Sequence, residues 1–151
     1  FIFQKYKFNK DMMMTKQEVK EEMKQTEGDP FIKGKIKSKQ MQMAQSRMMA
    51  EIPKADVVVT NPTHYAVALK YEMGKSAPKV IAKGVDLVAQ KIKEIAVQNN
   101  VPLHEDVPLA RALYAACEIG DEIPQKMFTA VAKVLAYVYK LKNKKKKKTI
   151  V

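Results

Sequence analysis

The chain has 151 residues, of which 46% are hydrophobic, so it holds enough apolar side chains for one folded domain with extensions. Its single cysteine, Cys117, excludes a disulfide framework and a multi-cysteine zinc site, and it fits a reducing compartment. Cys117 ends an apolar run that begins at Leu113. We therefore expect a small buried side chain there, in preference to a reactive thiol.

The formal net charge of +12 is concentrated at the two ends of the chain. Residues 1–53 hold 11 basic and 7 acidic side chains, residues 54–139 hold 10 and 9, and residues 140–148 hold seven lysines and no acid. A domain that binds a nucleic-acid backbone usually carries positive charge on its folded surface, so this distribution argues against that function. For the run Lys144–Lys148 two readings stay open, a solvated disordered tail over residues 142–151 and a basic nucleic-acid-binding module.

Residues 1–8 interleave aromatic side chains with lysines, as segments at a membrane interface do. An arbitrary chain boundary is the alternative reading of this segment. No run of 18 apolar residues occurs, so we expect neither a membrane-spanning helix nor a signal peptide within the chain.

Residues 9 to 52 are rich in polar, lysine and methionine side chains and predict helix with one break. Thr15–Glu18 has the capping-box pattern of a helix start. Gly28–Pro30 ends this helix and begins another, with Asp29 as N-cap and Pro30 at the first helical position. The second helix has only a thin apolar stripe and closes at Pro53. We expect residues 1–53 to form a long helical juxtamembrane linker arm.

Residues 54–141 alternate between strand and helix patterns, which predicts a compact α/β domain in which helices surround a small four-stranded sheet. Short β-branched or alternating runs predict strands at residues 55–59, 65–71, 79–82 and 101–104. Apolar residues at helical spacing predict helices from Asp86, as N-cap, to Asn99, from Pro108 to about Cys117, and from Pro124 onward.

The dipeptide Asn61–Pro62 carries the candidate chemistry. An asparagine usually degrades when the backbone nitrogen of the next residue attacks its side-chain carbonyl. The proline nitrogen has no hydrogen, so this reaction cannot occur at Asn61–Pro62. The remaining route is attack of the Asn61 side-chain nitrogen on its own main-chain carbonyl, which leaves a succinimide on Asn61 and a free secondary amine on Pro62. Correct orientation can lower such a barrier by roughly 7–11 kcal/mol and backbone strain by only about 1–3 kcal/mol, so we expect orientation to dominate. An ordinary turn that is never cleaved is the alternative.

Two histidines accompany this dipeptide. His64 is a candidate to hydrogen bond within the turn or to protonate the departing Pro62 nitrogen as a general acid, with a purely structural role as the alternative. His104 lies in an apolar stretch and is expected to be structural. The serines, histidines and cysteine form no nucleophile motif, and neither a Gly-rich phosphate loop nor a paired-carboxylate site is evident. This disfavours an ordinary hydrolase, and we expect no cofactor and no metal.

The run Val57–Tyr71, with Asn61-Pro62-Thr63-His64 inside it, resembles the signature of the export switch proteins of flagellar and injectisome type III secretion. Further stretches resemble the same family in the same order along residues 15–141: Glu27–Pro30, Ala77–Gly84, Pro108–Tyr114, Glu118–Gly120 and Ile123–Pro124. The Ala77–Gly84 stretch favours the flagellar branch over the injectisome branch.

The resemblance implies the cytoplasmic domain of a protein embedded in the bacterial inner membrane, with transmembrane helices ahead of it and Phe1 near the membrane exit. It implies self-cleavage at Asn61–Pro62, with Asn61 as nucleophile, Pro62 carrying the leaving nitrogen, and Thr63 and His64 shaping the loop. This is one reaction of the chain on itself, without an external substrate. The resemblance also implies a switch of export from rod and hook substrates to filament substrates. The implied partners are other membrane components of the export apparatus, the hook-length control protein and exported substrates.

Overall fold

The computed structural model describes residues 2–149; within its first helix, the side chains of residues 8–15, 17, 23, 24, 26 and 27 lie outside the description. The described chain divides into two compact units, with the boundary between Ala44 and Gln45. This boundary falls nine residues before the end of the linker that we expected at Pro53.

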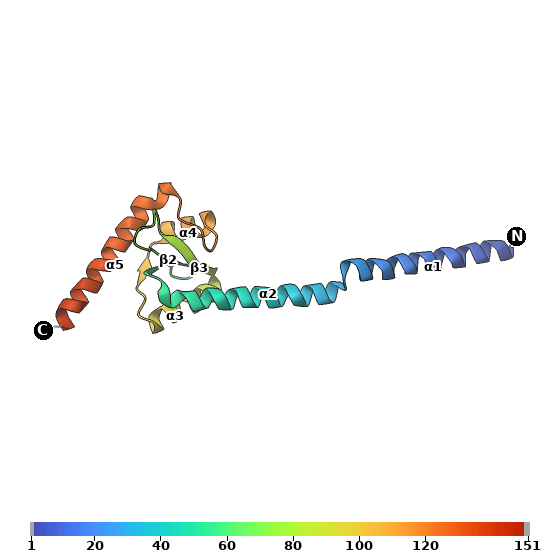
Figure 1. Cartoon of the computed structure of the whole chain (residues 1–151), viewed down its shortest axis with the longest axis horizontal. Coiled ribbons are helices and arrows are strands. Elements are labelled where there is room, and N and C mark those ends of the chain that lie inside the picture. Colours follow the sequence, from blue (N-terminus) through green and yellow to red (C-terminus); the bar gives the residue numbers. More distant parts are fainter. Residues whose placement is uncertain (1, 150–151) are drawn as a thin grey trace. The chain divides into compact units, whose positions relative to one another are not determined.

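Two long helices make up the N-terminal part, α1 (Ile2–Glu27) and α2 (Pro30–Glu51) (Figure 1). The predicted break between them is confirmed, because Gly28 has a φ of 79° and the Asp29 carboxylate accepts the Phe31 main-chain N–H at 3.0 Å. The helix begins well before Thr15, however, so the capping-box pattern at Thr15 lies inside α1. No described helix combines the length and the low polarity that crossing a membrane requires.

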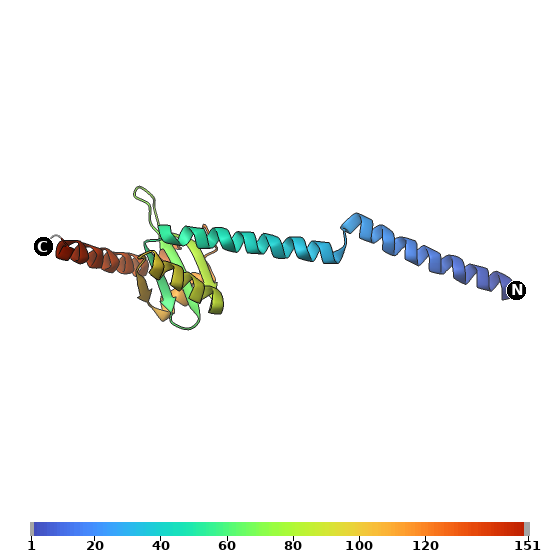
Figure 2. The same ribbon diagram turned by 90° about the horizontal axis from the view of Figure 1, so that it is seen from below.

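The second unit contains a four-stranded sheet in the order β3-β2-β1-β4, with helices on both of its faces (Figures 1 and 2). β1 pairs antiparallel with β2 and parallel with β4, and β2 pairs antiparallel with β3. The predicted α/β class is thereby confirmed. The elements after α2 are a short 3-10 helix (Ile52–Lys54), β1 (Val57–Asn61), β2 (Tyr65–Lys70), β3 (Lys79–Val85), α3 (Asp86–Gln98), β4 (Leu103–Glu105), α4 (Val107–Ala116), a second 3-10 helix (Gln125–Met127) and α5 (Phe128–Thr149).

Side chains of the central strand β1 enter two separate hydrophobic clusters. Val57 and Val59 pack with side chains of α4 and α5 on one face of the sheet, and Val58 packs with side chains of α3 on the other. Because successive strand residues point to opposite faces, a strand covered on both sides is apolar throughout. All five residues of β1 are buried, which fixes the strand that leads into Asn61.

Gly84 allows α3 to lie close against the sheet. A Cβ atom placed on Gly84 would lie 2.4 Å from a Val88 methyl carbon and 3.2 Å from the Ile92 Cδ1 atom. We expected the third strand at residues 79–82, but β3 continues through Gly84 to Val85 because the missing side chain admits the helix without breaking the strand pairing.

The structure differs from expectation at two helix ends. The N-cap of α3 is Val85 rather than Asp86, and Asp86 itself has a φ of 48°. At the C-terminus, α5 continues through the lysine run to Thr149, where we expected a disordered tail from residue 142. Lysine is a good helix former and the segment has no proline or glycine, so no residue there ends the helix.

We predict that Gly84→Ala lowers the free energy of unfolding of the second unit by about 1–3 kcal/mol, because the added methyl group overlaps Val88 in a packed core. Gly34→Ala is the matched control, since a Cβ at Gly34 meets nothing within 4 Å and alanine is the better helix former. Urea unfolding followed by circular dichroism measures both variants. An unchanged unfolding midpoint for Gly84→Ala would contradict the close packing of α3.

Candidate functional site

The four predicted site residues lie together in the connection between β1 and β2. Asn61 is the last residue of β1 and pairs with Tyr65, the first residue of β2, so only Pro62, Thr63 and His64 span the turn. The His64 main-chain N–H donates a hydrogen bond to the Asn61 carbonyl oxygen at 3.1 Å. The carbonyl group that the predicted reaction attacks is therefore already bound by a hydrogen-bond donor.

Burial separates Asn61 from the rest of this turn. Asn61 is 7% exposed, whereas Pro62, Thr63 and His64 are exposed. Among the described residues, the Asn61 carboxamide has no hydrogen-bond partner, and no completely buried side-chain nitrogen or oxygen is left without one. The carboxamide thus keeps contact with solvent, and no hydrogen bond holds it away from its own carbonyl carbon.

The turn achieves this arrangement without a left-handed residue. Within the described part of the chain, positive φ angles occur only outside residues 61–65, at Gly28, Gly74, Asp86, Asn100 and Gly120. Backbone strain of the kind that a positive φ imposes is therefore absent from the turn. That orientation, rather than strain, drives any reaction here stays a prediction.

The strand before the turn is anchored by its neighbour β4 as well as by β2. The Asp106 main-chain N–H donates to the Thr60 carbonyl oxygen at 3.0 Å, next to Asn61 in the chain. Thr60 is 5% exposed and pairs with Glu105 in the parallel ladder. These contacts fix the main chain up to the residue before the candidate nucleophile.

Helix α3 holds the other side of the turn through Lys93 and Asp86, neither of which the sequence assigned to the site. The Lys93 ammonium group donates to the Pro62 carbonyl oxygen at 2.6 Å, and the Asp86 main-chain N–H donates to the His64 carbonyl oxygen at 3.0 Å. The Asp86 carboxylate also lies 3.5 Å from the His64 Nδ1 atom, with both side chains mostly exposed. Lys93 lies 31 positions after Pro62, so no local pattern indicates the contact.

The remaining polar candidates lie away from this turn. The His104 ring packs edge-on against Tyr137, with ring centroids 5.6 Å apart, which fits the structural role expected for it. Cys117 is buried, as predicted, and burial raises the pKa of its thiol above the ordinary value, with the Asp121 carboxylate adding to the shift. Within the described residues, no group of three His, Cys, Asp or Glu side chains is arranged to hold a metal ion.

An apolar groove with a volume of about 400 Å³ opens between α5 and the connection from β2 to β3. This connection, residues 71–78, projects from the end of β2 opposite to the Asn61 turn (Figure 2). The side chains around the groove are mostly apolar: Tyr71, Ser76, Pro78, Phe128, Ala132, Leu135, Ala136 and Tyr139. Burial raises the pKa of the Tyr139 hydroxyl above its ordinary value, with the Asp56 carboxylate adding to the shift.

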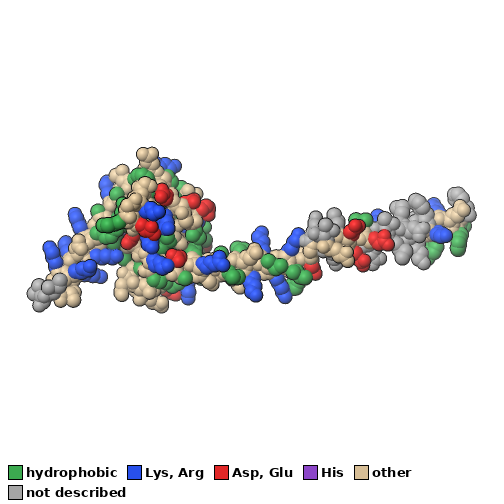
Figure 3. All heavy atoms as spheres, viewed as in Figure 1, with side chains coloured by type: hydrophobic (Ala, Val, Ile, Leu, Met, Phe, Trp, Pro, Cys, Tyr) green, Lys and Arg blue, Asp and Glu red, His purple; other side chains and the backbone are tan. Residues whose placement is uncertain are grey.

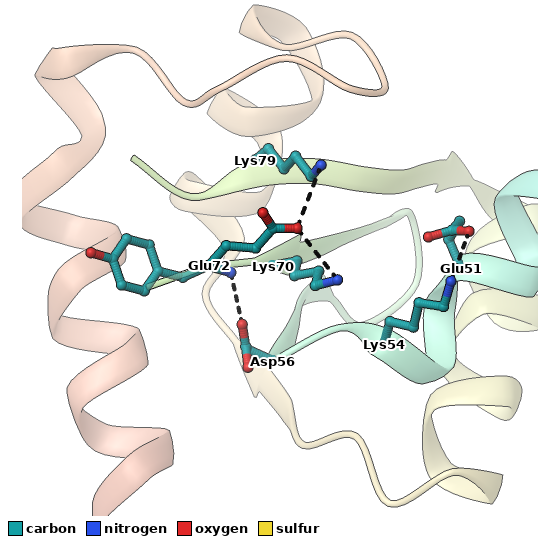
Figure 4. A network of polar contacts seen from close by, with 7 residues as sticks. Glu51, Lys54, Asp56, Lys70, Glu72 and Lys79 are labelled. Atoms are coloured by element: carbon teal, nitrogen blue, oxygen red, sulfur yellow. Dashed lines mark hydrogen bonds and ion pairs between the residues drawn. The ribbon is translucent and has the colours of Figure 1, made fainter. Parts of the chain in front are cut away.

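A network of polar contacts holds the strand ends beside this groove (Figure 4). The Asp56 carboxylate accepts the Tyr71 main-chain N–H at 2.7 Å. The Glu72 carboxylate lies 3.6 Å from the Lys70 ammonium group and 3.9 Å from that of Lys79, which joins β2 to β3. The groove therefore has one wall fixed by hydrogen bonds and ion pairs and another formed by the helix α5.

Lysine side chains gather along the C-terminal part of α5 (Figure 3). The residues from Lys142 to Thr149 are all exposed. The basic run is thus a solvated helical extension beyond Val138, the last buried residue of α5.

A model of the FlhB HrpN YscU SpaS family matches residues 1–138. The flagellar biosynthetic protein FlhB of Bacillus subtilis is 52% identical over 145 residues, which cover 95% of this chain and 40% of that protein. The FlhB protein of Escherichia coli is 55% identical over 143 residues, 94% of this chain and 37% of that protein. The chain thus spans about two fifths of the length of these relatives.

Two solved structures are similar as well. The cytoplasmic domain of FlhB from Shewanella putrefaciens matches with a TM-score of 0.65 and 53% identity, over 68% of this chain and 79% of that one. A mutated C-terminal domain of EscU matches with a TM-score of 0.58 and 36% identity, over 60% of this chain and 92% of that one. The resemblance that the Val57–Tyr71 run indicated is confirmed, and the flagellar branch is favoured. The chain belongs to the FlhB HrpN YscU SpaS family of export-apparatus components of type III secretion.

Proposed function

We propose that the chain cleaves its own backbone between Asn61 and Pro62 by asparagine cyclisation, and that this reaction serves the switch of export from rod and hook substrates to filament substrates. The observation that carries the proposal is the hydrogen bond from the His64 main-chain N–H to the Asn61 carbonyl oxygen, beside a carboxamide with no partner among the described residues. The reaction needs a hydrogen-bond donor to the carbonyl oxygen that is attacked and a side-chain nitrogen that is free to attack the carbonyl carbon.

In this mechanism, the Asn61 Nδ2 atom forms a bond to the Asn61 main-chain carbonyl carbon and closes a five-membered ring. The carbonyl oxygen gains negative charge in the tetrahedral intermediate, and the His64 main-chain N–H, 3.1 Å away in the starting state, stabilises it. The bond from that carbon to the Pro62 nitrogen then breaks. Nδ2 loses one proton and the Pro62 nitrogen gains one, so the products are a succinimide and a secondary amine.

The two fragments are expected to stay together after the reaction. Residues 1–61 contribute β1 to the sheet, and residues 62–151 contribute its neighbours β2 and β4. β1 is buried along its whole length and keeps its ladders to both neighbours when the turn is cut. Cleavage therefore removes one covalent bond and leaves the packing that holds the sheet.

The proposed setting of this reaction is supported by the family to which the chain belongs. Because the chain belongs to a family of export-apparatus components, we place it at the cytoplasmic face of the bacterial inner membrane, as part of a membrane-embedded protein. Its proposed partners are other membrane components of the apparatus, the hook-length control protein and exported substrates. An injectisome protein with the same cleavage is the alternative.

Exported substrates are also proposed to contact the apolar groove lined by Tyr71, Phe128 and Ala132. Chains that await export expose apolar side chains that a folded protein buries, and a mostly apolar groove offers them a dry surface. The groove lies at the end of β2 that is opposite to the cleavage turn. A substrate can therefore occupy it without covering Asn61.

Asn61→Ala removes the nucleophile, and we expect this variant to remain one intact chain. The unsubstituted chain is expected to give residues 1–61 and 62–151 as two species in intact-mass spectrometry after denaturation, and one particle in native gel filtration. Asn99→Ala, which removes a carboxamide at the end of α3, is the control and should still be cleaved. Equal fragmentation of Asn61→Ala, or a single unbroken unsubstituted chain, would overturn the proposal.

His64→Ala keeps the main-chain N–H and loses only the imidazole. We expect cleavage to be slower by roughly ten- to a hundredfold but still complete, because general acid assistance is lost while the donor to the Asn61 carbonyl stays in place. Pulse-labelled synthesis followed by a chase measures the rate. If the rate is unchanged, the imidazole has no part in the mechanism.

Ala132→Glu places a charge in the apolar groove, where an exposed position tolerates the substitution. We expect binding of a purified rod or hook subunit to weaken by about tenfold or more, because a carboxylate must be desolvated beneath an apolar segment. Self-cleavage should be unaffected. Ala115→Glu, on the exposed surface of α4, is the control. Equal binding of the two variants in isothermal titration calorimetry would exclude the groove as the contact.

A further inference from the structure

We propose that Lys93 is a positioning residue for the cleavage reaction. Its ammonium group, carried by α3, fixes the Pro62 carbonyl and thereby the ring nitrogen that leaves when the Asn61–Pro62 bond breaks. The inference rests on the proposed self-cleavage and adds to it a residue from an element outside the turn.

The contact between Lys93 and Pro62 is short and charge-assisted. The Nζ atom lies 2.6 Å from the carbonyl oxygen, slightly closer than the usual range of about 2.7–2.9 Å for charge-assisted hydrogen bonds. Lys93 is half-buried, and its neighbour Ile92 is completely buried against the sheet, so the helix that carries the ammonium group is fixed to the core. The donor therefore comes from a rigid element and acts on an exposed loop.

The turn has little else to fix Pro62. The proline has no N–H group to donate, and its side chain is exposed. The His64 N–H is used on the Asn61 carbonyl, and the His64 carbonyl oxygen accepts from the Asp86 N–H of α3. Lys93 thus holds the start of the turn and Asp86 holds its end, with both donors on one helix.

Holding the Pro62 carbonyl constrains the departing nitrogen directly. The proline ring locks φ at about −65°, so a single torsion, ψ, relates the carbonyl oxygen to the ring nitrogen across one Cα atom. A donor that holds the oxygen therefore restrains the plane of the scissile peptide bond, against which the Asn61 carboxamide must align. A misplacement of about 1 Å in such an alignment can cost roughly a hundredfold in rate, and loss of one of several contacts costs less.

Three substitutions test this role in the full chain. Lys93→Met keeps the length and apolar stem of the side chain and removes the donor; we expect cleavage about tenfold slower. Lys93→Arg restores a cationic donor and is expected to recover most of the rate. Lys91→Met is the matched control on the exposed surface of α3 and should cleave at the unsubstituted rate. Pulse-labelled cell-free synthesis with a chase gives the rates, and urea unfolding of cleavage-blocked forms carrying Asn61→Ala gives the stabilities.

The outcomes separate this proposal from the one on which it rests. Slow cleavage of Lys93→Met, rescue by Lys93→Arg and an unfolding midpoint equal to that of Lys91→Met support the positioning role. A normal rate for Lys93→Met in an experiment where the unsubstituted chain cleaves overturns the role of Lys93 and leaves the proposed function standing. A slow rate that follows a lowered unfolding midpoint, or that Lys93→Arg fails to restore, also overturns it. If the unsubstituted chain does not cleave, both proposals fall.

Discussion

The hydrogen bond from the His64 main-chain N–H to the Asn61 carbonyl oxygen is the contact on which the rest of the site depends. It closes the connection between β1 and β2 with three residues, and it lies on the one carbonyl group that the proposed chemistry attacks. The hydrogen bond needs a fixed main chain before and after the turn. Before the turn, β1 is fixed by pairing with both β2 and β4. After the turn, the pairing of Tyr65 with Asn61 fixes the start of β2.

The site combines a buried nucleophile with an exposed leaving group. Asn61 is nearly as buried as the valines before it, and the three residues that follow face solvent. Only 7% of the Asn61 residue is exposed, which limits the orientations of its side chain and lowers the entropy that the reaction must lose. Pro62 is exposed, so water as well as the His64 imidazole can supply the proton that its nitrogen gains. The turn itself has no positive φ angle. Asp86, which does have a positive φ, lies on the helix that holds the turn.

Local patterns in the sequence predicted most of the fold and the turn itself. The alternation from Tyr65 onward gave β2, the β-branched run before Asn61 gave β1, and the Gly28–Pro30 signal gave the break between α1 and α2. The contacts of Lys93 and Asp86 with the turn could not be predicted, because they join residues that only the packing of α3 on the sheet brings together. The helical end of α5 was not predicted, although a lysine run without glycine or proline continues a helix that the core has already nucleated.

The position of β1 inside the sheet has a kinetic consequence. β4 pairs with no strand except β1 within the described sheet, and β2 would keep only β3 if β1 left. Extraction of the shorter polypeptide would therefore expose two unpaired strand edges and both hydrophobic clusters at once. We therefore expect the two pieces of a nicked domain to separate only when the sheet and both clusters are disrupted. We expect such a domain to persist kinetically, and a force applied along β1 to shorten its lifetime more than dilution does.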